Sequence, residues 1–161
     1  MQIDVNNFDI NQVLTKELIS LNLKSQDKKG VIEELTDLLV QHGDVIDRKG
    51  FVDDVMKRET EGMTGLGEGV AIPHGKSQAV KNTTLAIGVS DHDIEWESLD
   101  GKPVNIIILF AVKDTDANTL HIKLLQKVAI LLADESFINS LHSVKTKEEL
   151  MQLFESQPKE G

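Results

Sequence analysis

A run of nine residues, Val104 to Val112, constrains the fold of this chain more than any other feature. The run is nearly all apolar, so polar and apolar residues do not alternate along it. Such a run is typical of a central strand that is covered on both faces of its sheet. It is far too short to span a bilayer, which takes about 20 apolar residues. The run therefore predicts a layered domain built around a buried strand.

Shorter patterns predict the elements around this strand. Alternation of apolar residues indicates further strands, and apolar stripes at helical spacing indicate amphipathic helices, one of them capped by Asp47. Thr146 and Glu149 stand at capping-box spacing for the last helix. The expected strands cover residues 18–23, 83–89 and 104–112, with a short strand leading into residue 74, and the expected helices cover residues 27–42, 47–59 and 117–133, followed by two short helices. Helices between strands indicate an α/β fold, a single domain with a mixed β-sheet packed between α-helices.

Composition narrows the class of protein. The 161 residues suggest one domain, residues 1–161, with a core from about 18 to 155. A net charge of −10 argues against a surface for nucleic acid or anionic lipid. With no cysteine, the chain has no disulfide, no thiolate catalysis and no cysteine-based zinc site. The N-terminus lacks the pattern of a signal peptide, so we expect a cytoplasmic protein.

The segment from Gly65 to Lys76 presents one histidine on a stiff backbone. Pro73 fixes its own φ and biases Ile72 toward extended geometry, and Gly75 is expected to let the chain turn immediately afterwards. His74 would then lie at a strand end, within reach of a partner. A neutral imidazole is a nucleophile that can carry a phosphoryl group, although a structural histidine is the alternative.

Three further residues are candidates to assist such a group. His121 lies in or near the first turn of the expected helix 117–133, where free N–H groups favour anions, although a buried structural histidine is the alternative. Arg58 could bind a phosphoryl group through two hydrogen bonds, or be a solvated cation. Glu68 could orient Arg58 or an imidazole, or be an exposed loop carboxylate. His74, His121 and Glu68 could in principle bind a metal, but no compact ligand spacing supports this, so neither a metal nor a cofactor is expected.

The other histidines are expected to be ordinary. His42 lies in the last turn of a helix, where a cationic side chain suits the dipole. His92 is expected in an acidic loop between two strands, and His142 at the end of a short helix. The glycine stretch is not a Walker loop, because it lacks the terminal Gly-Lys-Ser/Thr, so ATP binding is not expected.

Arg58-Glu59 followed by the segment from Thr64 to Gly75 resembles the active-site signature of the fructose/mannitol-type EIIA family of the sugar phosphotransferase system (PTS). Leu120-His121-Ile122 is similar to the family's second-histidine motif. Trp96 and the segment Leu99 to Val104 resemble the fructose branch more than the mannitol branch. The resemblance runs from about Leu18 to Phe154.

The resemblance implies a phosphotransferase. His74 would accept a phosphoryl group from phospho-HPr and pass it to a cysteine of a separate EIIB component, which supports sugar uptake, of the fructose family, through the membrane component EIIC. His121 and Arg58 would stabilise the phosphoryl group, with Glu68 in support. A regulatory, nitrogen-type EIIA whose phosphorylation is a signal is the main alternative, and a metal-dependent hydrolase is a remote one. We also expect Met63, Leu66 and Val70 to form an apolar rim around the site, and the alternative is that they are buried beneath the loop.

Overall fold

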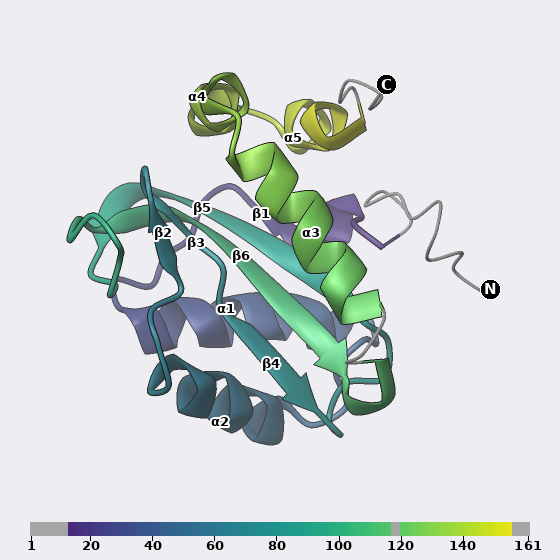
Figure 1. Ribbon diagram of the computed structural model, residues 1–161. Helices are drawn as coiled ribbons and strands as arrows, with labels where there is room; N and C mark the ends of the chain where they lie inside the picture. Colours follow the sequence, from purple (N-terminus) through teal and green to yellow (C-terminus); the bar gives the residue numbers. More distant parts are fainter. Residues whose placement is uncertain (1–12, 117–119, 156–161) are drawn as a thin grey trace.

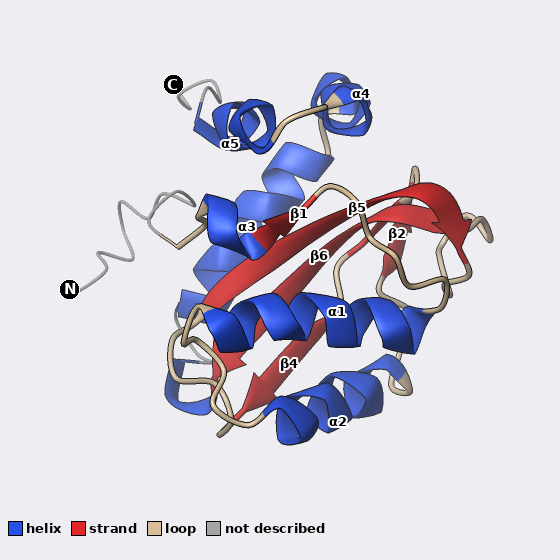
Figure 2. Ribbon diagram, turned by 180° about the vertical axis from the view of Figure 1, so that it is seen from behind, coloured by secondary structure: helices blue, strands red, loops and turns tan. Residues whose placement is uncertain are grey.

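The chain folds as a mixed β-sheet with helices on both faces (Figures 1 and 2). The computed structural model describes residues 13–116 and 120–155, without the side chains of residues 116, 120, 121 and 155. The strands are β1 (Ile19–Ser20), β2 (Gly65–Gly67), β3 (Val70–Ala71), β4 (His74–Ser77), β5 (Thr84–Ile94) and β6 (Val104–Lys113). The helices are α1 (Lys28–Gln41), α2 (Arg48–Glu59), α3 (Leu120–Leu132), α4 (Glu135–Ser143) and α5 (Lys147–Glu155), with 3₁₀ turns at Lys16–Leu18 and Asp114–Asp116.

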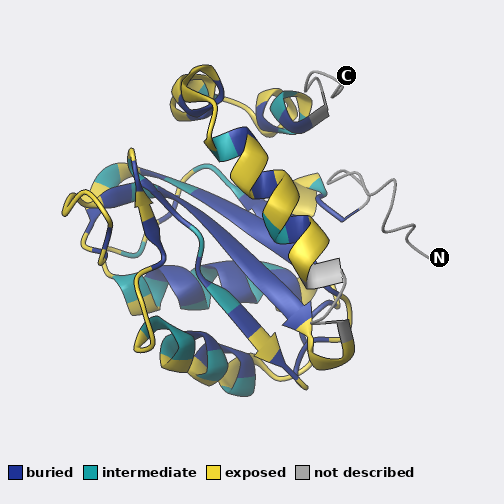
Figure 3. Cartoon of the chain, viewed as in Figure 1, coloured by how far each residue is buried: buried dark blue, intermediate teal, exposed yellow. Residues whose placement is uncertain are grey.

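Strand β6 is the centre of the sheet, as its apolar run predicts. Of its residues 104–112, all but the half-buried Asn105 are buried (Figure 3). It pairs antiparallel with β5 and parallel with both β3 and β4. The sheet order is β1-β5-β6-β3-β2, and β4 continues along the edge of β6 that β3 begins. Ile72 and Pro73 separate β3 from β4. The carbonyl of Pro73 accepts a hydrogen bond from the N–H of Phe110 at 2.9 Å.

The first two helices cover one face of the sheet, and α3 crosses the other (Figures 1 and 2). Helix α2 begins at the predicted cap, since Asp47 accepts from the N–H of Gly50, and α1 begins at an aspartate cap that was not predicted, since Asp27 accepts from the N–H of Gly30. The predicted capping box of α5 also forms, since Thr146 and Glu149 each accept the other's N–H. None of the described helices combines the length and apolar character that crossing a membrane requires.

The expected elements differ from the structure in three places. The strand expected over residues 18–23 is only two residues long, because a 3₁₀ turn takes up Leu18 and the chain bends at residues 21 and 22. His92 lies within β5 and not in a loop, because this strand continues through the acidic residues to Ile94. Residues 65–77 form three short strands in place of a glycine loop and one strand.

Candidate active site

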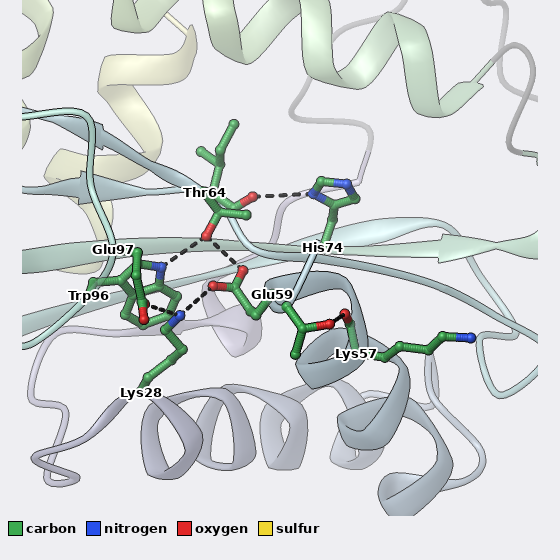
Figure 4. Close-up of polar contacts among 9 residues, drawn as sticks. Lys28, Lys57, Glu59, Thr64, His74, Trp96 and Glu97 are labelled. Atoms are coloured by element: carbon green, nitrogen blue, oxygen red, sulfur yellow. Dashed lines mark hydrogen bonds and ion pairs between the residues drawn. The ribbon is translucent and has the colours of Figure 1, made fainter. Parts of the chain in front are cut away.

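His74 is the first residue of β4 and points to the α3 side of the sheet. Its strand pairs in parallel with β6, where His74 stands opposite Phe110. Successive side chains of a strand alternate between faces. The position of a side chain at Gly75 faces α2, so His74 faces away from α1 and α2, as Figure 4 shows. The imidazole is half-buried at this edge of the sheet.

Gly75 serves close packing and not a turn, so the expected turn is wrong. Its φ is not positive, and β4 continues through it to Ser77. A Cβ atom on Gly75 would lie 2.6 Å from Cγ2 of Val55 and 3.0 Å from Cε1 of Phe51, both fully buried in α2. The absence of a side chain therefore lets α2 approach β4 and brings the end of α2 to the histidine.

Arg58, in the last turn of α2, contacts the imidazole directly. Its Nε donates a hydrogen bond to Nε2 of His74 at 3.1 Å. A guanidinium can only donate, so Nε2 carries a lone pair and the proton of the neutral ring is on Nδ1. Nδ1 lies 3.4 Å from the carbonyl oxygen of Ile72. The backbone and Arg58 together fix a tautomer in which Nε2 is the nucleophilic atom.

The surroundings keep this imidazole neutral. Burial, assisted by the positive charge of Arg58, lowers the pKa of His74 from its ordinary value of 6.5, although the Ile72 carbonyl and the charges of Glu59 and Glu61 oppose the shift. A lowered pKa leaves most of the rings unprotonated at pH 7. The histidine is therefore poised as a nucleophile.

The guanidinium of Arg58 retains unused donor capacity. Its Nη1 is buried and has no hydrogen-bond partner, and no carboxylate among the described residues forms an ion pair with it. A buried donor without an acceptor is costly, and such a group in a native structure calls for an explanation. An anion bound at His74 would supply the acceptor.

The structure places the other two candidates differently. His121 is the second residue of α3, within its first turn as predicted, but its side chain lies outside the described residues. Glu68 lies at the exposed tip between β2 and β3 with a φ of 58°, between glycines that also have positive φ. Its carboxylate contacts neither Arg58 nor His74 among the described groups, so its supporting role stays a prediction.

Side chains from two distant segments hold this tip in place. Asp100 accepts the N–H of Glu68 at 3.1 Å, and Nε2 of His142 lies 2.6 Å from the carbonyl oxygen of Glu68 and donates to it. His142 was expected to be ordinary, and the sequence carried no signal for this contact because 74 residues separate the two groups. The strained tip is therefore fixed by its backbone, which leaves the carboxylate of Glu68 exposed.

Of the three residues predicted to form an apolar rim, two are exposed, as a rim requires, and one is not. Met63 is 56% exposed and Leu66 38% exposed, whereas Val70 is 1% exposed and belongs to the core. Val70 is buried because β3 pairs with β6. Leu99, 69% exposed, is a further exposed apolar residue beside this hairpin, since its N–H donates to the carbonyl of Gly65 in β2.

The sequence did not predict a polar network around Glu59, the residue after Arg58 (Figure 4). Glu59 accepts hydrogen bonds from Lys28 at 2.7 Å and from the hydroxyl of Thr64 at 2.6 Å. Trp96 donates to the same hydroxyl at 2.9 Å. The only available signal was the adjacency of Arg58 and Glu59, because the partners come from three other segments. Within the part of the chain that the structure describes, no three His, Cys, Asp or Glu side chains gather as a metal site.

Known proteins resemble the chain in sequence and fold. Residues 12–157 match the family described as "Phosphoenolpyruvate-dependent sugar phosphotransferase system, EIIA 2". The PTS system fructose-specific EIIABC component of Bacillus subtilis (strain 168) is 33% identical over 150 residues, 93% of this chain and 24% of that protein. The PTS system fructose-specific EIIA component of Haloferax volcanii is 34% identical over 140 residues, 87% of this chain and 90% of that protein. The crystal structure of the nitrogen regulatory protein IIA-Ntr from Neisseria meningitidis matches with a TM-score of 0.82 and 31% identity, over 90% of this chain and 98% of that one.

The chain belongs to the EIIA 2 family of the phosphoenolpyruvate-dependent sugar phosphotransferase system. Membership supports a phosphotransferase role, and the match to the IIA-Ntr structure confirms the expected single-domain α/β fold. The chain spans about a quarter of the length of the EIIABC relative, 24%. Fructose-specific and nitrogen regulatory proteins both occur among the relatives.

Proposed function

We propose that this EIIA domain is a phosphocarrier of the sugar phosphotransferase system and that Nε2 of His74 carries the phosphoryl group. The observation that supports this most directly is the contact of 3.1 Å between Nε2 of His74 and Nε of Arg58. It gives a neutral imidazole with its lone pair on Nε2, held beside a cation whose Nη1 has no partner among the described groups. A nucleophile with an adjacent fixed cation suits phosphoryl transfer, which depends on positioning and charge stabilisation.

The two transfers use the same atom. In the first, the Nε2 lone pair forms a bond to the phosphorus of a phosphohistidine on HPr, and the donor's P–N bond breaks with its electron pair returning to the donor imidazole. In the second, a thiolate of a separate EIIB component forms a P–S bond, and the electron pair of the broken bond returns to Nε2. The 161 residues include no cysteine, so the acceptor thiol must lie outside them.

The supporting residues have separate roles in this proposal. Arg58 turns its guanidinium from Nε2 toward the arriving phosphoryl oxygens and binds them through charge-assisted hydrogen bonds. His121 adds an imidazole N–H and the field of the first turn of α3. Glu68 supports the site from the exposed tip, and Met63, Leu66 and Leu99 form an apolar docking surface for both partners. A surface that must release each partner in turn is expected to be small.

The fructose-like segment Leu99 to Val104 and the fructose-specific relatives favour a transport role. In that role the protein works in the cytoplasm and feeds the membrane component EIIC through EIIB. The nitrogen regulatory relatives favour a second candidate, in which phosphorylation of the same histidine is a signal. The two roles share the first transfer and differ in the second.

Phosphorylation with phosphoenolpyruvate, Enzyme I and HPr, followed by mass spectrometry, tests the proposal. We expect one acid-labile phosphoryl group per chain on His74, no label on His74→Ala, and full label on the remote control His42→Ala. His121→Ala should accept the group but transfer it more slowly. Loss of the label to an added fructose-type EIIB supports transport, and retention with every sugar-specific EIIB supports signalling. Label that persists in His74→Ala would refute the proposed acceptor.

A further inference from the structure

Arg58 lies next to a carboxylate in sequence and yet pairs with none among the described groups. A guanidinium ordinarily forms strong, often bidentate, hydrogen bonds with a nearby carboxylate. Here its Nε donates to His74, and its Nη1 has no partner among the residues that the structure describes. Glu59 follows directly in the chain, so some feature of the structure must keep the two side chains apart.

The carboxylate of Glu59 is already occupied on both oxygens (Figure 4). Lys28 donates to Oε1 at 2.7 Å, and the hydroxyl of Thr64 donates to Oε2 at 2.6 Å. The side chain of Glu59 is only 4% exposed, so water cannot replace these partners. A buried carboxylate that lost them would take the nearest available cation.

Lys28 is held firmly in this position. It is the first residue of α1, and its ammonium also pairs with Glu97 and lies 5.1 Å from the centre of the Trp96 ring. Burial alone would lower the pKa of Lys28, but the hydrogen bonds and charges of Glu59 and Glu97 outweigh it and raise the pKa. The ammonium therefore stays charged at any working pH.

We propose that Lys28 and Glu59 are positioning residues, whose ion pair keeps the Glu59 carboxylate away from Arg58 and so leaves the guanidinium available to His74 and its phosphoryl group. This inference rests on the proposed role of His74 as phosphoryl acceptor. Neither residue touches the reacting atoms. The pair acts by removing a competitor from the vicinity of Arg58, and Thr64 completes the arrangement.

Charge removal and its rescue test the inference. Lys28→Met keeps an apolar stem against Trp96 and removes the ammonium. We expect the Glu59 carboxylate to form an ion pair with Arg58 in its place. We expect kcat for transfer from phospho-HPr to fall about a hundredfold to a thousandfold, the range for loss of one preorganised donor, with KM for HPr unchanged. Glu59→Gln in the Lys28→Met background should restore kcat to within about threefold of the wild type, because a neutral amide does not compete. Lys49→Met, which breaks an exposed ion pair with Asp53, is the matched control and should have no effect.

Nuclear magnetic resonance on the unphosphorylated protein gives an independent readout. The Arg58 Nε–H resonance should shift in Lys28→Met and return in the double variant. If wild-type His74 takes no phosphoryl group, the proposed function fails, and this resonance still decides the inference. Normal transfer in Lys28→Met, or a double variant as slow as the single one, overturns it.

A second variant covers the case in which Lys28→Met does not fold. Thr64→Val frees one oxygen of Glu59 and leaves the ion pair intact. Transfer should slow by a smaller factor, and adding Glu59→Gln should restore it. No recovery of kcat in that double variant contradicts the inference.

Discussion

Replacing Gly75 by alanine is expected to push α2 away from the sheet and to weaken the site without touching a polar group. The new Cβ would lie 2.6 Å from Cγ2 of Val55, about 0.8 Å inside the 3.4 Å at which ordinary van der Waals contact begins. Phe51, at 3.0 Å, blocks a move to the other side. Both neighbours are fully buried, so neither can turn into solvent.

The expected cost is that of overpacking a core by one methyl group, about 1–3 kcal/mol of unfolding free energy. For a domain of this size, this corresponds to a fall in Tm of about 2–12 °C. Relief of the clash by a shift of α2 would also lengthen the contact between Arg58 and His74, because Arg58 lies on the same helix. We therefore expect slower transfer from phospho-HPr even at temperatures where the variant is fully folded.

Thermal and urea unfolding of Gly75→Ala, Val55→Ala and the double variant measure the clash as a coupling energy. Val55→Ala removes the methyl group nearest to the new Cβ. The loss of unfolding free energy in the double variant should therefore be smaller than the sum of the losses in the two single variants, by about 1 kcal/mol or more. Additive effects, or a Gly75→Ala protein as stable as the wild type, would refute the packing argument.

Two further predictions concern charge and the rim. Burial lowers the pKa of His74, whereas the hydrogen bond that Nδ1 of His92 donates to Asp91 raises that of His92, so NMR titration should find the two rings on opposite sides of about pH 6.5. Just below that pH the unfolded chain binds more protons at residue 74 than the folded one, so stability rises with pH there, and His74→Gln should flatten this slope in urea unfolding at several pH values. Leu66→Ala should raise KM for HPr and leave Tm within about 2 °C, whereas Val70→Ala should lower unfolding free energy by about 1–3 kcal/mol, and the reverse pattern would contradict the assignment of rim and core.

The sequence predicted those elements whose signals are local. The aspartate cap of α2, the capping box of α5 and the apolar run of β6 each depend on residues within a few positions of one another. Local hydrogen bonding and periodicity therefore carried the assignment of helices and of the central strand. The end of β5 was missed because its acidic residues lack the apolar alternation of a strand.

The hairpin of β2 and β3 and the strand β4 could not be predicted, because their pairing partners lie far away in the sequence. Strands of two to four residues have no periodicity of their own, and β3 and β4 exist only through pairing with β6. The sequence correctly predicted that Arg58 could lie close to His74. It did not predict the reason for their contact, which is the packing of α2 against Gly75. Lys28 and Glu59 are 31 residues apart, and no pattern along the chain links them.

The pairing of β3 and β4 with a later strand has a consequence for synthesis. While the chain grows from its N-terminus, the histidine segment leaves the ribosome before β6 exists, so its backbone has no partner strand. The hydrogen bond from His142 to the tip at Glu68 forms later still, because His142 follows β6 in the chain. A nascent chain truncated before residue 104 would therefore contain both Arg58 and His74 but would lack the strand that assembles the site around them.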